Sequence, residues 1–398
     1  MSIYSPFSKS QLLPQEEKLE IARHKSALFI GIPKENSYQE RRVCLTPDAV
    51  SSLVSHGHRV LLESGAGENS SYLDKEYSEA GAEITNDTKK VFGCPIVLKV
   101  EPATLDELAL INPQTILISA LQLKTQTKSY FEALTQKKIT AIAFEYIKDE
   151  DGSYPAVKSL SEIAGTASIL IASELMIGDK TGKGLLFGNI TGVPPTKVVI
   201  LGAGTVAEFA AKTALGLGAN VEVFDNSITK LRRLQNTLTQ RIFTSTLQEK
   251  TLLKSLRRCD VAIGAMKGKN RAPIVVTETM VEHMKKGSII VDVSIDTGGC
   301  FETSEVTTHE KPTFVKNEVI HYCVPNIPSR YSKTASLSIS NIITPFLLQI
   351  AEDGGIESAI RCHSGLKNGI YCYHGVQTNK SIADWFSLQF CDINLLIF

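Results

Sequence analysis

One stretch in the middle of the chain, KVVILGAGTVAEFAAK at residues 197–212, constrains the fold more than any other feature. It begins with mainly apolar, β-branched residues, which indicate a strand. Gly202 and Gly204 follow directly, before a run with helical spacing. A second apolar stretch, NVEVF at 220–224, ends in Asp225, which is 23 positions after Gly202. Strand, glycine turn, helix, strand and acid in this order predict a βαβ unit of a parallel α/β sheet.

This order of elements is typical of a site that holds a dinucleotide. Gly202 permits the tight turn, Gly204 lets the backbone approach the pyrophosphate, and Ala207 permits close packing of the helix on the sheet. The pyrophosphate is then expected at the helix N-terminus, where unpaired N–H groups and the helix dipole favour negative charge. Asp225 stands where a carboxylate bonds the ribose 2′-hydroxyl. This acid favours NAD over NADP, because a 2′-phosphate would meet a like charge.

Three basic residues just beyond the acid soften the preference for NAD. Lys230, Arg232 and Arg233 lie within eight positions of Asp225, where cations could serve a 2′-phosphate. The simpler interpretation is that they form the solvated face of a helix. Strictness for NAD over NADP therefore stays open at this point.

The bulk composition indicates an ordinary globular protein. The 398 residues hold 42 Lys+Arg and 42 Asp+Glu, and this zero net charge gives no reason to expect a nucleic acid or an anionic membrane as partner. The start of the chain lacks the apolar region of a secretory signal. No apolar run reaches about 18 residues, so no transmembrane segment is expected.

The eight cysteines are scattered, without a C-x-x-C motif, which is typical of reduced thiols in a cytoplasmic protein. Cys362, His363, Cys372 and His374 are close in sequence, but their spacing fits no standard zinc pattern. We therefore expect no metal.

Strand and helix signals alternate along the chain, which predicts parallel pairing and an α/β fold. A helix is expected in DAVSSLVSHG, with Gly57 as its stop, a second from Ser159, and a third in LSISNIITPFLLQIAEDGG beyond residue 335. The last of these could cross back to an earlier domain. The strands are expected in ALFIGI, HRVLLE, CPIVLKV, TILISAL, ITAIAFEYI, KVVIL, NVEVF, CDVAIGAM and GSIIVDVSID.

Several longer motifs are similar to those of a known family. They are GIPKENSYQERRVCLTPDAV (31–50), LESGAGENSSYLDKEYSEAGAEI (62–84), LKVEP (98–102), SEIAG (161–165), VDVSIDTGGCFETS (291–304) and HYCVPNIPSRYSKTAS (321–336). Together they resemble the alanine dehydrogenase / transhydrogenase alpha-subunit family, from about residue 27 to near the C-terminus. DTGGCFE and YCVPNIP resemble the alanine dehydrogenase branch more than the transhydrogenase branch.

The resemblance implies an architecture of two α/β domains. A Rossmann-type NAD-binding domain is inserted in a substrate domain, and members of the family are typically homo-oligomers, often hexamers. On this basis we expect an N-terminal extension over 1–26 and the first part of the substrate domain over 27–155. The NAD-binding domain is expected over 156–335, and the return to the substrate domain over 336–398.

The resemblance also implies which residues form the site. Arg42 matches the arginine that grips the substrate carboxylate, as a guanidinium can do with two parallel bonds. Lys99 matches a lysine that contacts the substrate carbonyl or carboxylate and would stabilise charge there. Asp296 matches an aspartate near the nicotinamide, at the carboxyl edge of the sheet. Ser161 and Asn326 match residues that touch the cofactor's phosphates and its nicotinamide side.

Each of these residues also has a structural interpretation. Arg42 could be a surface arginine, and Asp296 could cap a turn. Ser161 could be a helix N-cap. Asn326, which lies between two prolines, could be a turn residue.

The chain departs from the family pattern at one catalytic position. The resemblance places an acid/base histidine at Gln122, in TILISALQLKT. Glutamine can orient a substrate through hydrogen bonds, but it does not titrate. Asp296 or Lys99 would then carry the proton transfer, and losing one general acid/base typically costs about 10² to 10⁴ in rate. The substitution makes alanine turnover uncertain without affecting the fold.

Three functions follow from this pattern. The first is reversible NAD-dependent oxidative deamination of L-alanine to pyruvate and ammonia, with hydride passing from Cα to the nicotinamide. The second is a dehydrogenase for a different amino or oxo acid, as in the related saccharopine-forming or lysine-releasing enzymes, because a changed acid/base residue can mark a changed substrate. The third is an NAD(H)-binding subunit related to the transhydrogenase alpha subunit, which performs no deamination.

Overall fold

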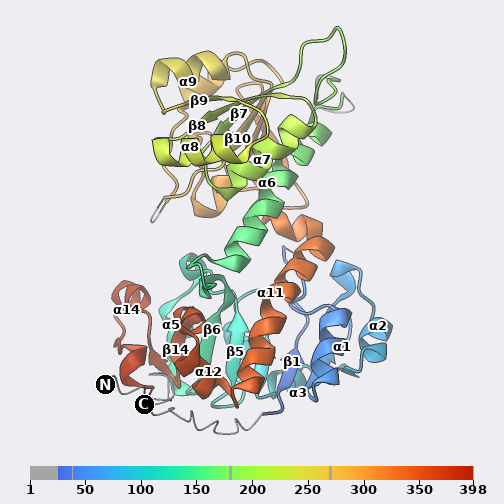
Figure 1. Cartoon of the computed structure of the whole chain (residues 1–398), viewed down its shortest axis with the longest axis vertical. Helices are drawn as coiled ribbons and strands as arrows, with labels where there is room; N and C mark the ends of the chain where they lie inside the picture. Colours follow the sequence, from blue (N-terminus) through green and yellow to red (C-terminus); the bar gives the residue numbers. More distant parts are fainter. Residues whose placement is uncertain (1–25, 38, 179–181, 269–270, 398) are drawn as a thin grey trace, which may run out of the picture.

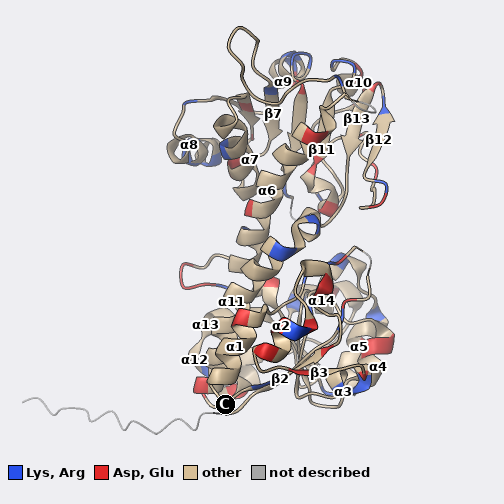
Figure 2. Cartoon of the chain, turned by 90° about the vertical axis from the view of Figure 1, so that its right-hand side faces the viewer, with Lys and Arg blue, Asp and Glu red and all other residues tan. Residues whose placement is uncertain are grey.

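The computed structural model describes residues 26–397 except 38, 179–181 and 269–270, so the expected extension over 1–26 lies almost wholly outside the described residues. Two lobes, each built on one sheet, are joined by two long helices, α6 (Pro155–Leu175) and α11 (Ser332–Glu352) (Figure 1). Acidic and basic side chains are scattered over both lobes, as the zero net charge leads one to expect (Figure 2).

The first sheet has eight strands in the order β15-β14-β6-β5-β4-β1-β2-β3. Strands β1 to β6 pair in parallel, and β14 and β15 add an antiparallel edge, so the C-terminal part of the chain returns to the first domain as expected. The strands are β1 (Phe29–Ile32), β2 (Arg59–Glu63), β3 (Glu83–Thr85), β4 (Ile96–Leu98), β5 (Ile116–Ser119), β6 (Thr140–Ala143), β14 (Ile370–Tyr373) and β15 (Val376–Gln377).

Short helices pack against this sheet. The expected helix in DAVSSLVSHG is confirmed as α1, which begins with proline in its first turn and is followed by Gly57 at a φ of 86°. Helix α4 begins with a capping box between Thr104 and Glu107. The helices are α1 (Pro47–Ser55), α2 (Asp74–Glu79), α3 (Thr88–Phe92), α4 (Leu105–Leu110), α5 (Lys128–Gln136), α12 (Ile356–Cys362), α13 (Ser364–Gly369) and α14 (Lys380–Phe386).

The second sheet has seven strands in the order β12-β13-β11-β10-β7-β8-β9. Apart from β12, which runs antiparallel to β13, its strands pair in parallel and follow the 3-2-1-4-5-6 order of a Rossmann domain. Its elements are β7 (Lys197–Leu201), α7 (Thr205–Gly216), β8 (Asn220–Phe224), α8 (Ile228–Thr237), β9 (Phe243–Ser245), α9 (Glu249–Leu256), β10 (Val261–Gly264), α10 (Glu278–Glu282), β11 (Ile289–Asp292), β12 (Thr313–Lys316) and β13 (Val319–Tyr322).

Single 3₁₀ turns complete the fold, and several of them follow strands at the carboxyl edges of the sheets. They are η2 (Glu68–Ser70), η3 (Leu123–Thr125), η4 (Phe144–Tyr146), η5 (Val293–Thr297), η6 (Ile327–Tyr331) and η7 (Ile393–Leu395).

Helix α6 begins earlier than the sequence indicated. The expected start at Ser159 is wrong, because Pro155 opens the helix and Tyr154 is its N-cap. Proline suits a first helical turn, where its missing N–H costs nothing and its fixed φ is already helical. Ser161 therefore lies inside the helix, and the interpretation of Ser161 as an N-cap is wrong.

Helix α11 crosses from the second lobe to the first. Ile339, Ile343, Leu347 and Ile350 are buried in the core of the first domain, so the expected crossing helix is confirmed. Among the described residues, the segment Ile327–Glu352 is also long and apolar enough to span a membrane, with 50% of its most apolar window buried inside the protein. A buried core helix meets the same criterion, so the segment is weak evidence for a membrane span.

Helices α6 and α7 pack without room for a side chain between them. A Cβ built on Gly165 would lie 2.4 Å from the carbonyl oxygen of Val206 and 2.9 Å from Cβ of Phe209. A backbone atom cannot give way as a flexible side chain can. Gly165 therefore fixes how closely α6 approaches the start of α7.

We expect Gly165→Ala to lower the free energy of unfolding by about 1 to 3 kcal/mol, because the methyl group forces the two helices apart. Gly216→Ala is the matched control, since a Cβ on Gly216, at the end of α7, meets nothing within 4 Å. Denaturant unfolding of both variants measures the difference. Equal stability of the two variants would contradict the packing argument.

Candidate functional site

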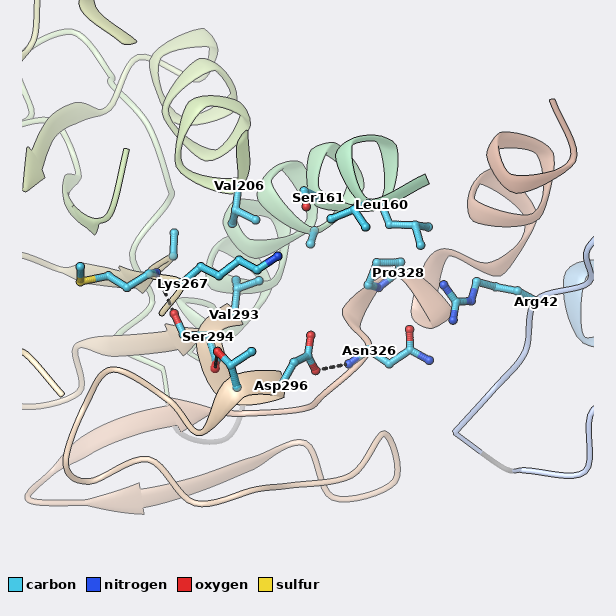
Figure 3. A pocket seen from close by; sticks show the side chains of 15 residues that line it. Arg42, Leu160, Ser161, Val206, Lys267, Val293, Ser294, Asp296, Asn326 and Pro328 are labelled. Carbon is cyan, nitrogen blue, oxygen red and sulfur yellow. Dashed lines mark hydrogen bonds between the residues drawn. The ribbon is translucent and has the colours of Figure 1, made fainter. Parts of the chain in front are cut away.

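A cavity of about 360 Å³ lies at the carboxyl edge of the second sheet. The second lobe lines it with residues of α6, the start of α7 and the loops after β10, β11 and β13, and the first lobe contributes Arg42 (Figure 3). Its lining residues are Arg42, Val157, Leu160, Ser161, Ala164, Val206, Ala265, Met266, Lys267, Val293, Ser294, Asp296, Thr297, Asn326 and Pro328. Open α/β sheets bind ligands at this edge, near the point where the strand order reverses.

The cavity brings together four of the residues expected at the site. Arg42, Ser161, Asp296 and Asn326 come from positions up to 284 apart in sequence, yet all line the same space. Lys99, Gln122, Asp225 and the two glycines of the turn are not among the lining residues.

Arg42 is buried beside a carboxylate that the sequence analysis did not identify. Its Nε and Nη2 donate to the two carboxylate oxygens of Glu40 at 2.7 and 2.5 Å. The side chains of Arg42 and Glu40 are 6% and 0% exposed, so the interpretation of Arg42 as a surface arginine is wrong. Burial raises the pKa of Glu40, but the charge and hydrogen bonds of Arg42 outweigh it and hold that pKa below its usual value.

Asp296 and Asn326 form the nucleotide-domain side of the cavity. The backbone N–H of Asn326 donates to Oδ1 of Asp296 at 3.0 Å, and the side-chain amide of Asn326 donates to Glu40 at 3.0 Å. The side chain of Asp296 is exposed to solvent. Desolvation by the protein atoms around it raises its pKa, against the opposing effects of the Asn326 N–H and the charge of Arg42. A carboxyl group with a raised pKa is better suited to exchange a proton near neutral pH.

A second aspartate holds the loop that carries Asp296. Asp292 ends β11 and is fully buried. Its carboxylate accepts hydrogen bonds from the N–H groups of Ser294 and Cys300 and from the hydroxyl of Ser304, at 3.0, 2.9 and 2.7 Å. The sequence analysis passed over Asp292, although an acid at the end of an apolar strand could have indicated it.

Lys99 directly follows β4 and is not among the residues that line the cavity. Its Nζ is 2.7 Å from Oε1 of Glu107 and 3.5 Å from Oε2 of Glu35, and its side chain is 3% exposed. Burial lowers the pKa of Lys99, but the two carboxylates outweigh burial and raise it. Burial raises the pKa of Glu35 to about 7, against the lowering effects of Lys99 and the Val100 N–H. Lys99 therefore stays charged, with Glu107 as its nearer partner.

Gln122 lies in the turn after β5 and is exposed. Its backbone is left-handed, with φ 46° and ψ 52°. The carboxylate of Glu145 accepts from the N–H of Leu121 at 2.7 Å and from that of Gln122 at 3.4 Å, which fixes the turn. The positive charge of Lys124, two residues on, opposes the rise in the pKa of Asp296 as the smallest of the named effects.

The glycine turn has the geometry expected for a dinucleotide. Gly202 has a φ of 113°, and a Cβ there would lie 2.4 Å from the carbonyl oxygen of Ala265, so only glycine fits. A Cβ on Gly204 would meet nothing within 4 Å, which leaves open space at the start of α7. Ala207 is fully buried in the core of this domain. These residues fit a pyrophosphate placed at the helix N-terminus.

Asp225 ends the second strand of the motif and is bonded to the turn. Its Oδ2 accepts from the N–H of Ala203 at 2.8 Å, and its Oδ1 accepts from that of Ser227 at 2.7 Å. Nη2 of Arg233 donates to the carbonyl oxygen of Ala203 at 3.3 Å. Of the three basic residues beyond the acid, Arg233 thus reaches the glycine turn instead of only facing solvent.

Lys267 is a further lining residue that the sequence analysis missed. It follows β10, and Figure 3 shows its ammonium directed into the cavity beneath α6. The expected strand CDVAIGAM ends one residue before Lys267, so the rule that ligands bind at the carboxyl ends of strands could have indicated it. A cation here can contact phosphate or carboxylate groups.

The cysteines and histidines near the C-terminus do not gather around a common point. Cys372 is buried and Cys362 is exposed, while Nε2 of His363 lies 2.7 Å from Asp353. Within the described parts of the chain, no group of three or more His, Cys, Asp or Glu residues could hold a metal ion.

Comparisons with known proteins agree with this geometry. Residues 31–164 match the profile described as alanine dehydrogenase/PNT, N-terminal domain, and residues 168–380 match the corresponding C-terminal domain. The alanine dehydrogenase of Staphylococcus epidermidis (strain ATCC 12228) is 37% identical over 92% of this chain and 98% of its own length. The chain belongs to the alanine dehydrogenase/PNT family.

Solved structures place this family member in the same fold. A structure of L-alanine dehydrogenase superposes with a TM-score of 0.85 and 33% identity, covering 90% of this chain and 99% of that one. Transhydrogenase from Sinorhizobium meliloti superposes with a TM-score of 0.75 at 23% identity, covering 89% and 99% of the two chains, which shows the shared fold alone. The expected two-domain α/β fold is confirmed.

Because Glu35 is buried, we expect the stability of the protein to depend on pH. Its pKa is raised from 4.5 to about 7 in the folded protein. Below pH 4.5 the carboxyl is neutral in both states. Between pH 4.5 and about 7, Glu35 is ionised in the unfolded protein but still largely neutral in the folded protein. The free energy of unfolding therefore falls as the pH rises through this range. A shift of this size corresponds to at most about 3 kcal/mol.

We therefore expect Glu35→Gln to gain stability relative to the wild type as pH rises from 4.5 to 7. Thermal unfolding of both proteins across this range measures the gain. Asp260→Asn is the control, since Asp260 is a largely buried carboxylate paired with Lys285. It directly precedes β10, at the amino end of the second sheet and away from the cavity. A difference between Glu35→Gln and wild type that stays constant over the range would contradict the raised pKa.

Proposed function

We propose that this chain catalyses the NAD-dependent oxidative deamination of L-alanine to pyruvate and ammonia, in either direction. The observation that carries the proposal is the single cavity that joins Arg42, Asp296 and Asn326 beside the glycine turn. Relatives that are alanine dehydrogenases by name, matched over nine-tenths of the chain, support the choice of substrate. The chain is then an oxidoreductase whose other ligand is a small amino or oxo acid.

The residues divide the work by position. Arg42 binds the substrate carboxylate, and Lys99 provides the positive charge that stabilises negative charge on the oxo group. Asp296 holds or releases the proton that moves as the amino group is exchanged with water. Ser161, Gly202 and Gly204 would hold the dinucleotide, while Ala207 lets α7 pack closely on the sheet. The bound dinucleotide would supply the hydride donor or acceptor.

Asparagine and glutamine complete the site without titrating. Asn326 would contact the nicotinamide side of the cofactor. Its backbone N–H donates to Asp296 and its side-chain amide donates to Glu40, which keeps both carboxylates in place. Gln122 can only orient the substrate, so the proton transfer falls to Asp296, while Lys99 acts through its charge.

A second candidate function is favoured by Gln122, namely a dehydrogenase for a different amino or oxo acid. The fold and the cofactor turn would be the same in that case, and only the substrate would differ. The third possibility, a subunit that binds NAD(H) without deamination, has the likeness of fold to transhydrogenase in its favour.

The assembly and location follow from the family as proposals. We propose that the chain forms a homo-oligomer, a hexamer by the family resemblance, in the cytoplasm. Size-exclusion chromatography with light scattering measures the first.

The decisive test is NADH oxidation by the purified protein with pyruvate and ammonium. We expect turnover by the wild type and a loss of about 10² to 10³ in Lys99→Ala, which removes the charge that stabilises the developing negative oxygen. Gln122→His should raise the rate, because it restores a titratable group. A wild type that binds NADH but stays silent, alone and as Gln122→His, would contradict alanine as substrate; a panel of other oxo acids then tests the second candidate.

We propose NAD rather than NADP as the cofactor, on the strength of Asp225. In Asp225→Ser, NADPH should gain on NADH, because the charge that repels the 2′-phosphate is gone and Arg233 lies beside the turn. The ratio of kcat/KM for the two cofactors measures this. Arg233→Ala in the same background should remove the gain; an unchanged ratio in Asp225→Ser would mean that the acid does not select the cofactor.

A further inference from the structure

Glu40 and Arg42 lie in the irregular segment between β1 and α1, directly after a turn in which the N–H of Glu40 donates to the carbonyl oxygen of Ser37 at 3.1 Å. The backbone N–H of Arg42 donates to Oε1 of Glu40 at 2.9 Å, in addition to the two bonds from its guanidinium. Glu40 thus receives three hydrogen bonds from one residue and is ionised in the folded protein.

The same carboxylate also bonds the opposite domain. Oε2 of Glu40 accepts from Nδ2 of Asn326, whose backbone N–H in turn donates to Asp296. The series Arg42–Glu40–Asn326–Asp296 therefore runs without a break from one lobe to the other. A parallel bond flanks it, from the N–H of Arg41 to Oγ of Ser329 at 2.9 Å.

This arrangement leaves one part of the guanidinium for a ligand. Glu40 uses the edge formed by Nε and Nη2, so Nη1 and the outer side of Nη2 remain. Figure 3 shows the tip of Arg42 directed towards Asn326 and Pro328, at the end of the cavity nearest the first lobe. A substrate carboxylate on the remaining edge would lie at a distance from Asp296 that Glu40 sets.

We propose that Glu40 is a positioning residue for the substrate. It fixes Arg42 and Asn326 relative to each other. The substrate carboxylate, bound by Arg42 of the first lobe, is then held at a set distance from Asp296 of the second lobe, which transfers the proton. The proposal rests on the function proposed above. A displacement of about 1 Å in a bound substrate can cost about 100-fold in rate, so a residue that sets this distance has a large effect without touching the substrate.

The test uses Glu40→Gln, which keeps the size of the side chain but loses its charge and one acceptor, and Glu40→Ala, which leaves a vacancy. We expect kcat/KM for pyruvate to fall about 100-fold in both, while the Kd for NADH, measured by fluorescence, changes less than about threefold. Formate should partly restore Glu40→Ala by supplying a carboxylate beside Arg42, and it should not accelerate the wild type. Asp260→Asn serves as the control for loss of a buried carboxylate.

Two further measurements distinguish a positioning role of Glu40 from a purely structural one. Neither of them requires the protein to turn pyruvate over. The affinity of the protein–NADH complex for pyruvate should fall in both Glu40 variants, whether or not the wild type turns pyruvate over. Hydrogen exchange of residues 326–331 should accelerate in both variants and stay unchanged in Asp260→Asn. The bond from Asn326 is weakened in Glu40→Gln, which keeps one neutral acceptor, and lost in Glu40→Ala, while Asp260→Asn leaves it in place.

Particular results would overturn the proposal. These are folded Glu40 variants with wild-type kcat/KM and exchange, an equal loss in Asp260→Asn, or a Glu40→Ala variant that formate does not restore. A wild type that neither binds nor reduces pyruvate would defeat the proposed function instead. The exchange of residues 326–331 would then still decide whether Glu40 holds the two lobes in register.

Discussion

The close approach of α6 to α7 at Gly165 is the constraint on which the site depends. Helix α6 carries Ser161 and Leu160 in the roof of the cavity, and Val206, at the start of α7, lines the same space. Because the carbonyl oxygen of Val206 occupies the place where a side chain on Gly165 would lie, the roof cannot move away from the glycine turn without opening the helix pair. Cofactor binding and the joint between the lobes therefore share one packing contact.

Charge balance is the second constraint on the cleft. Two buried cations, Arg42 and Lys99, are each compensated by a carboxylate within 3 Å, Glu40 and Glu107. Burying either cation alone would be costly, because an ion taken out of water needs a partner and further hydrogen bonds. Compensation also fixes the two side chains in place, so the site is organised before a ligand arrives. Glu35 is the exception: its Oε2 lies 3.5 Å from Nζ of Lys99 without a hydrogen bond, and burial raises its pKa.

The sequence predicted what is local and missed what is not. The glycine turn, the acid at Asp225 and the long apolar helices follow from short-range patterns, and the structure has them as expected. The missed strands, such as β3, β14 and β15, have two to four residues and gain their stability from pairing with distant strands. Glu40 could have been found, because it is the acid closest in sequence to Arg42 and a buried guanidinium needs a carboxylate partner. The pairing of Lys99 with Glu35 could not have been predicted, because it depends on β1 and β4 lying side by side in the sheet.

The position of Gln122 shows how a changed acid/base residue leaves the fold intact. Its turn is held by main-chain bonds to Glu145, which do not depend on the side chain at 122. Among the described residues that line the cavity, Asp296 is the one carboxylate. Glutamine at this position removes a second titrating group from the site. The proton is then left to Asp296, which is hydrogen-bonded to Asn326 and through it to Glu40 of the other lobe.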